Sequence, residues 1–114
     1  MWDGKQKAVT FSYDDGVCQD RRLVDMFNYY HVKATFNINS GMQTYASHYD
    51  FGNVRVHHMN AEGLKELYKG HEIAVHTLTH QDLTKLDKDT VYNEVFLDKQ
   101  NLERMFDCQI TGMA

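Results

Sequence analysis

The chain has 114 residues, of which 42% are hydrophobic and 25% charged, with a formal net charge of -4. This length fits one domain with a modest core, and the composition argues against an intrinsically disordered chain. The mild charge and the lack of a Lys/Arg block argue against nucleic acid or an anionic membrane as a partner. No apolar run reaches the ~20 residues of a membrane span.

Residues 1–7 contain no apolar signal region, so we expect no export signal. A cytoplasmic location is therefore the default, while the cell envelope or secretion stays open for a processed chain. Cys18 and Cys108 lie far apart and form no disulfide framework pattern, so we expect two free thiols.

The apolar pattern predicts strands that alternate with helices along the chain. The predicted strands cover residues 7–13, 33–38, 71–77 and 108–113. The predicted helices cover residues 18–30, 60–68 with Asn60 as N-cap, and 87–107 with Asp87 as N-cap. Residues 41–58 show no sustained period and are predicted to form a long loop, and Leu83 and Leu86 lie in a connecting turn.

This alternation is typical of an α/β fold with a parallel sheet and right-handed crossovers. In such sheets the chemistry gathers at the carboxyl ends of the strands. Asp14 and Asp15 follow the first predicted strand, and His76 and His80 follow the third. We therefore expect the two polar clusters to meet at one edge of the sheet.

Two imidazoles and a carboxylate are a common ligand set for a catalytic divalent ion with one open position. His76, His80 and one of Asp14 and Asp15 supply that set. Zinc is favoured by the imidazoles, and Co, Ni, Mn and Fe are also compatible. The second aspartate can then act as a base toward a metal-activated water, which would attack an ester or amide carbonyl.

Other polar residues have less specific surroundings in the sequence. His71 opens a predicted strand at the end away from the two clusters, so we interpret it as a surface or packing residue. The histidine pair at 57–58 lies in the predicted loop and is expected to be solvated. Nothing pairs Cys18 with a base, which argues against a nucleophile. Tyr45 and Tyr49 could stack on a sugar, but loop packing is the simpler interpretation.

Three stretches together resemble the polysaccharide deacetylase family, whose shared domain is the NodB homology domain. Residues 10–16, Thr-Phe-Ser-Tyr-Asp-Asp-Gly, resemble its first motif, with a Ser-Tyr step before the aspartates. Residues 70–73 followed by 76–80, His-Thr-Leu-Thr-His, resemble its second motif, and residues 34–41 are similar to its second strand. The resemblance covers nearly the whole chain.

The resemblance implies specific roles and a reaction. Asp14 would be the catalytic base, Asp15, His76 and His80 the metal ligands, and Thr77 a residue that orients their loop by hydrogen bonding. The implied reaction is hydrolytic removal of an acetyl group from an N- or O-acetylated oligo- or polysaccharide, with the metal helping to stabilise the oxyanion.

The later motifs of the family are absent: an Arg/Pro/Tyr loop, an Asp/Trp stretch and a Leu/His segment that supplies the general acid. We therefore expect residues 1–114 to form a single partial domain, the N-terminal half of a deformed (β/α) barrel that ends after its fourth strand. Exposed edges of such a half-barrel predict self-association, and the missing acid predicts weak or no turnover.

Two other interpretations remain open at this point. The chain could be a non-catalytic metal- or sugar-binding half-domain that acts through self-association. It could also be a metal-free scaffold in which the motifs arise by chance. The spare carboxylate beside the ligand set favours the hydrolase, because a purely structural metal site has no need of it.

Overall fold

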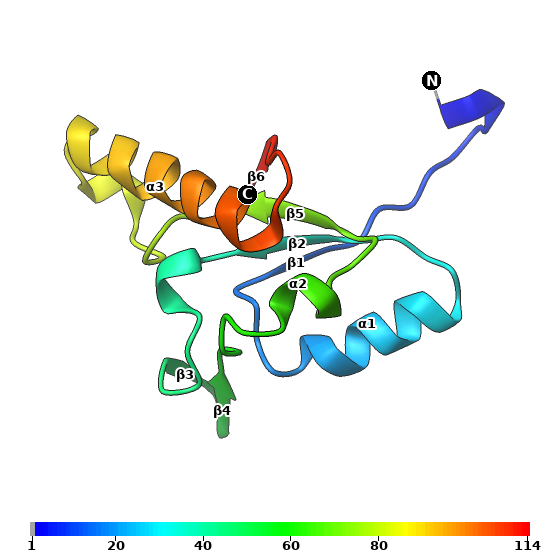
Figure 1. Ribbon diagram of the computed structural model, residues 1–114, viewed down its shortest axis with the longest axis horizontal. Helices are drawn as coiled ribbons and strands as arrows, with labels where there is room; N and C mark the ends of the chain where they lie inside the picture. Colours follow the sequence, from blue (N-terminus) through cyan, green and yellow to red (C-terminus); the bar gives the residue numbers. More distant parts are fainter. Residues whose placement is uncertain (1) are drawn as a thin grey trace.

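The computed structural model describes residues 2–114, and its centre is a four-stranded parallel sheet with the strand order β1-β2-β5-β6 (Figure 1). The strands are β1 (Ser12–Asp14), β2 (Thr35–Ile38), β5 (Glu72–Val75) and β6 (Gly112–Met113). The helices between them are α1 (Asp20–Tyr29), α2 (Leu64–Leu67) and α3 (Lys88–Phe106). The predicted parallel α/β fold is confirmed.

The helices bury their apolar stripes in one core, which also takes in one face of the sheet. Val24 and Phe27 of α1 and Leu102 and Phe106 of α3 join the buried cluster that contains Phe36 of β2. Leu64 and Tyr68 extend it from α2 and its C-terminal end. The four-residue spacing of the α3 pair and the three-residue spacing of the α1 pair place each pair on one helix face, as amphipathic packing requires.

The other face of the sheet is polar. Cross-strand partners share a face, and Ser12, Thr35 and Glu72 are aligned across β1, β2 and β5. Thr35 donates a hydrogen bond to Glu72, and Ser12 accepts one from Asn37. Ser12 and Glu72 are exposed, so this open face presents hydrogen-bonding groups and not an apolar patch.

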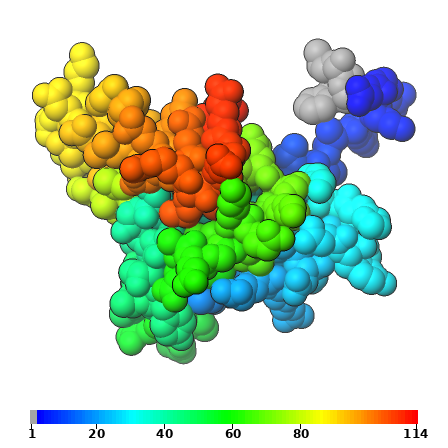
Figure 2. All heavy atoms as spheres, viewed as in Figure 1, coloured from blue at the N-terminus to red at the C-terminus, as the bar shows by residue number. Residues whose placement is uncertain are grey.

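The first strand is shorter than the predicted 7–13 and lies later in the chain. β1 hydrogen-bonds only to β2, whose first residue, Thr35, is aligned with Ser12. Residues 3–10 are exposed and do not pair with any strand, although the β-branched and aromatic residues from 7 onward favour an extended conformation. The blue N-terminal segment accordingly stands away from the body of the molecule (Figure 2).

The prediction of a long loop over residues 41–58 is wrong. After a short 3-10 turn at Ser40–Met42, the chain forms an antiparallel hairpin of β3 (His48–Phe51) and β4 (Val54–His57). The hairpin projects away from the main sheet (Figure 1). It belongs to the connection that leaves the carboxyl end of β2, which is the edge where the two polar clusters lie.

Asn60 does not cap α2, contrary to the prediction. The helix begins at Leu64 after Gly63, and the Asn60 carboxamide oxygen accepts a hydrogen bond from the main-chain N–H of Tyr45. Asp87 does cap α3 as predicted, because its side chain accepts from two N–H groups of the first turn. Leu83 opens a 3-10 turn, Leu83–Lys85, in the predicted connection.

Two further sequence expectations have simple outcomes. Cys18 and Cys108 are free thiols, as predicted. Over residues 2–114 the longest helix is α3, and no helix is both long and apolar enough to cross a bilayer.

Candidate metal centre

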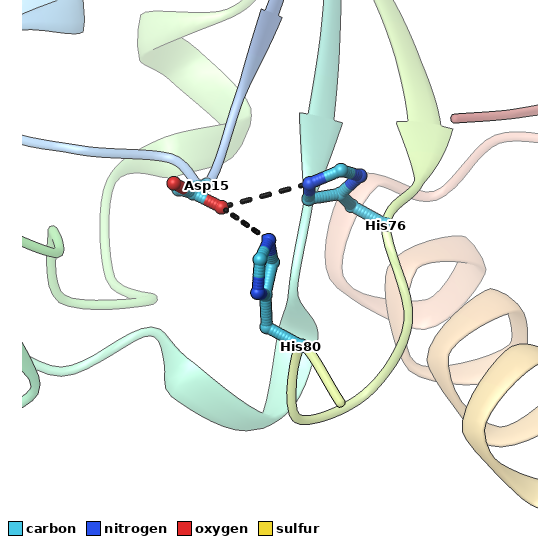
Figure 3. A group of neighbouring side chains, drawn as sticks. All are labelled: Asp15, His76 and His80. Carbon is cyan, nitrogen blue, oxygen red and sulfur yellow. Dashed lines mark ion pairs between the residues drawn. The ribbon is translucent and has the colours of Figure 1, made fainter. Parts of the chain in front are cut away.

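Asp15, His76 and His80 converge at the carboxyl edge of the sheet (Figure 3). Oδ1 of Asp15 lies 3.6 Å from Nε2 of His76 and 3.5 Å from Nε2 of His80. One ligand atom from each of the three side chains lies within 4.8 Å of the others. The sheet, in which β2 lies between β1 and β5, thus brings together residues that are more than sixty positions apart in the sequence.

The three side chains fit a divalent ion. Ligands about 2.0–2.2 Å from a tetrahedral zinc lie roughly 3.3–3.6 Å from one another, which matches the Asp15–histidine distances. Oδ1 of Asp15 is buried and has no hydrogen-bond partner within the described part of the chain. A buried carboxylate oxygen without a partner is energetically costly, and binding of a cation to this atom would remove that cost.

The backbone around the cluster is strained. Asp15, Thr77 and His80 have φ values of 75°, 66° and 56°, in the left-handed region that L-residues other than glycine rarely adopt. Each such residue costs about 1 kcal/mol or more, and such strain persists only where surrounding contacts impose it. Two of the three are side chains of the candidate site, which indicates that the chain is shaped to aim them.

The segment 76–80, here called the ligand loop, is held from inside by its own threonine. Thr77 is buried, and its hydroxyl oxygen accepts a hydrogen bond from the main-chain N–H of His80 at 3.1 Å. This bond closes the turn that brings His80 back toward Asp15. The hydroxyl of Thr77 is thus placed to hold the two ends of the ligand loop together.

Helix α3 fixes the ligand loop through two buried carboxylates. Asp98, which is fully buried, accepts from the main-chain N–H groups of His76 at 3.1 Å and Ser40 at 2.7 Å. Burial raises the pKa of Asp98 above its usual range. Glu94 accepts from both the N–H and the hydroxyl of Thr79, at 2.9 and 2.8 Å.

These two carboxylates were not predicted from the sequence, although a signal for them exists. Glu94 and Asp98 stand at the same four-residue spacing as Leu102 and Phe106, on the buried stripe of α3. A carboxylate on a buried stripe needs a partner, so its position alone indicates a polar contact inside the fold.

The end of β2 supports the cluster from the other side. Asn39, which is fully buried, donates to the main-chain oxygens of His76 and Thr77. Gln43 donates to the main-chain oxygen of Asp15 at 2.8 Å. These amides join the turn after β1 to the ligand loop, so both halves of the cluster share one hydrogen-bonded frame.

His76 presents a defined nitrogen to the cluster. Its Nδ1 lies 2.8 Å from the main-chain oxygen of Ala114, which accepts a hydrogen bond when Nδ1 carries the proton. In that tautomer Nε2, which faces Asp15, has a free lone pair. The protein thus selects the nitrogen that a metal would use.

Asp14 lies beside the cluster but outside its pocket. Its side chain is on the open face of the sheet, where Oδ1 accepts a hydrogen bond of 2.7 Å from the buried amide of Asn37. It borders a neighbouring hollow together with Asp20, next to α1. The structure therefore brings Asp15, His76 and His80 together and leaves Asp14 exposed at their flank.

A pocket of about 340 Å³ opens onto the cluster, lined by Asp15, Met42, Tyr49, His58, Thr79 and His80. The prediction that the 57–58 pair is solvated is wrong for His58, which is 1% exposed. An isolated bridge to Val17 draws it under the turn after β1. Burial and the nearby carboxylate of Asp15 raise the pKa of the Tyr49 hydroxyl above its ordinary value.

The other weak candidates have structural surroundings. His71 packs against Phe36 and accepts a hydrogen bond from the N–H of Ala34, as expected for a packing residue. Cys18 donates to the main-chain oxygen of His58. Tyr45 stacks on His57 with ring centroids 4.2 Å apart, as expected for loop packing. Of the two tyrosines, only Tyr49 lines the pocket.

Comparison with known proteins decides the family. The family model described as polysaccharide deacetylase matches residues 3–114. The chain belongs to the polysaccharide deacetylase family. A bifunctional xylanase/deacetylase of Pseudobutyrivibrio xylanivorans is 27% identical to it over 96 residues, which are 79% of this chain and 13% of that protein.

Solved structures agree on the fold. The Streptococcus pyogenes deacetylase PplD, in complex with acetate, matches with a TM-score of 0.78 and 20% identity, over 96% of this chain and 46% of that one. A family 4 acetyl xylan esterase from Clostridium thermocellum, in complex with a cobalt ion, matches with a TM-score of 0.68 and 17% identity, over 94% and 47%. The predicted half-barrel of the NodB type is confirmed, and the chain spans slightly less than half of these two structures.

Proposed function

We propose that this chain carries the metal site of a hydrolase that removes acetyl groups from N- or O-acetylated carbohydrate. The observation that carries the proposal is the orphaned, buried Oδ1 of Asp15, which faces Nε2 of both His76 and His80 at metal-ligand spacing. Membership of the deacetylase family supports the reaction class.

In this proposal Asp15, His76 and His80 hold a divalent ion. Zinc suits two imidazoles and a carboxylate, and Co, Ni, Mn and Fe are accepted by the same donors. When bound, such an ion supplies Lewis-acid activation of a water and of the acetyl carbonyl. The hydrogen bonds of Thr77, Asn39 and the α3 carboxylates then serve to keep the two imidazoles aimed at one point.

Asp14 is proposed as the base that takes the proton from the attacking water. Its Oδ1 is fixed by the Asn37 amide, so Oδ2 is the oxygen that would receive the proton. The exposure of Asp14 on the open face supports this role, since a base must reach substrate and solvent. In this proposal the acetyl group lies in the pocket that Asp15 and Tyr49 line.

Metal analysis of the purified protein tests the site. We expect close to one zinc per chain after loading and dialysis, and loss of that zinc in both Asp15→Ala and His76→Ala. His48→Ala is the matched control, because His48 is exposed on the hairpin and outside the cluster. Zinc retained by both ligand variants, or lost from the control as well, would overturn the assignment.

Acetate release from an acetylated oligosaccharide tests the base. Asp14→Asn should keep the wild-type zinc content and lose most of the weak acetate release that is expected of this chain without its general acid, since an amide cannot accept the proton. If Asp14→Asn releases acetate at the wild-type rate, the proton acceptor is another group.

A second candidate is a non-catalytic metal- or sugar-binding half-domain that acts through self-association. The open sheet favours it: β1 and β6 each have one neighbour within the described residues, and unpaired strand edges are templates for pairing. Sedimentation at micromolar concentration distinguishes the two. A dimer that binds zinc and releases no acetate supports this candidate, and a stable monomer excludes it.

A further inference from the structure

The β3–β4 hairpin has one apolar face and one polar face. The cross-strand pairs Tyr49–Val56 and Phe51–Val54 share the first face. The pairs His48–His57 and Asp50–Arg55 occupy the second, where Arg55 and Asp50 form an ion pair of 3.0 Å. This alternation is what a ribbon shows when one of its faces meets a partner.

The apolar face, here called the hairpin strip, consists of Tyr49, Phe51, Val54 and Val56. Nothing in the described chain covers its outer end, because Phe51 is 78% and Val54 57% exposed. The open aromatic ring at the hairpin tip is therefore accessible to a ligand and could gain stability from its burial.

The inner end of the hairpin strip is continuous with the candidate metal centre. Tyr49 belongs to both, since it also lines the pocket that contains Asp15 and His80. The Tyr49 ring stands at a steep angle to the buried ring of His58, with centroids 5.9 Å apart, so it is anchored in place. An apolar track therefore leads from the pocket to the hairpin tip.

We propose that the hairpin strip binds the glycan chain on the sugars next to the one whose acetyl group lies in the pocket. This inference rests on the proposed function and names where its polymer substrate is held. Sugar rings have C–H faces that pack on aromatic rings while their hydroxyls remain in water. Tyr49 and Phe51 are two strand positions apart, roughly 7 Å, and on the same side, so they can contact successive parts of one chain.

The charge of the strip agrees with this ligand. Its four side chains are all uncharged, whereas the opposite face carries the Asp50–Arg55 pair. An N- or O-acetylated sugar is neutral, and an apolar strip accepts it without burying an unpaired charge. A second copy of the chain is the competing occupant, and the experiment below separates the two.

The test is titration of the metal-free protein with N-acetylchitohexaose and with acetylated xylohexaose, by calorimetry and by NMR. We expect at least one oligosaccharide to bind and to shift the amide signals of residues 49–56. Phe51→Ser should weaken that binding roughly fivefold or more, because a stacked ring is lost. His48→Ser, on the opposite face of the same strand, should bind like the wild type.

Each other outcome overturns the inference. Equal affinity of Phe51→Ser and wild type would remove Phe51 from the site, as would shifts confined to the pocket. If neither oligosaccharide binds a protein that does bind zinc, the hairpin proposal fails while the metal site stands. If Phe51→Ser instead abolishes concentration-dependent self-association and leaves glycan affinity unchanged, the strip is an interface between copies.

Discussion

Removal of the Asp98 carboxylate tests whether α3 positions the ligand loop. Asp98→Ala leaves two inward-facing N–H groups, those of His76 and Ser40, without their acceptor. Each orphaned group costs about 1–3 kcal/mol, and the relief from no longer burying a carboxylate offsets part of the total. We expect the free energy of unfolding to fall by about 2–4 kcal/mol.

The pH of the measurement matters because burial raises the pKa of Asp98. A carboxyl group with a raised folded-state pKa stabilises most at low pH and loses part of that contribution as pH rises through the raised pKa. The cost of Asp98→Ala is therefore smallest at high pH. Urea unfolding at pH 8 gives a lower bound, and the cost should grow as the pH falls through the raised pKa toward that of an ordinary aspartate.

The assay that links this change to function is zinc affinity. By releasing the N–H of His76, Asp98→Ala should weaken zinc binding about tenfold, as loss of outer partners of metal ligands commonly does. Asp89→Ala, at an exposed position of the same helix, should change neither quantity by more than about 0.5 kcal/mol. Wild-type zinc affinity in a destabilised but folded Asp98→Ala would refute the positioning role.

Three further changes test the frame around the site. Burial raises the pKa of Asp20 from 3.8 to about 6, so the wild type loses about 3 kcal/mol of folding free energy as the pH rises from about 4 to about 7. Asp20→Asn does not titrate and should therefore gain about 3 kcal/mol relative to the wild type over that range. The Tyr68 hydroxyl can still donate its hydrogen bond to the asparagine oxygen. A pH-independent difference in urea unfolding would contradict this. Gly41→Ala would place a Cβ 2.5 Å from the main-chain oxygen of Leu78 and should cost about 1–3 kcal/mol by thermal unfolding. Asn39→Leu leaves two carbonyls of the ligand loop without their donor. The free energy of unfolding should fall by about 2–5 kcal/mol, and zinc should bind more weakly.

Matched controls keep these tests specific. Asp25→Asn, at an exposed position of α1, should leave the pH dependence of stability as in wild type. Gly63→Ala tests the steric argument for Gly41, because Gly63 has open space around its Cα. Its left-handed φ of 87° still costs about 1 kcal/mol for alanine, so a smaller loss than that of Gly41→Ala is expected.

The sequence alone determined the layout of the sheet and the residues that could form the site. Alternating strands and helices require parallel crossovers, and parallel strands place their carboxyl ends at one edge. That rule placed Asp14 and Asp15 near His76 and His80 but did not decide which of the two aspartates faces the histidines. The N-cap role of Asp87 was equally predictable, because an N-cap depends only on the helical turn that follows it.

Elements that depend on neighbours were not readable in this way. The hairpin at 48–57 has short strands that pair only with each other, and its alternation spans too few residues to stand out within the segment 41–58. The start of β1 was misplaced because strand length is set by the partner, and β2 begins only at Thr35. His58 became buried because a bridge to Val17 draws it under a distant turn.

Only the tertiary structure decided how the site is held. Local propensity disfavours the left-handed backbone of Asp15 and His80, and hydrogen bonds from the segment after β2 and from within the ligand loop oppose that preference. The partners of Asp98 lie 58 and 22 residues away along the chain, beyond the reach of any local pattern. Residue types and order specified the chemistry, whereas long-range hydrogen bonds and close packing set the distances at which it can operate.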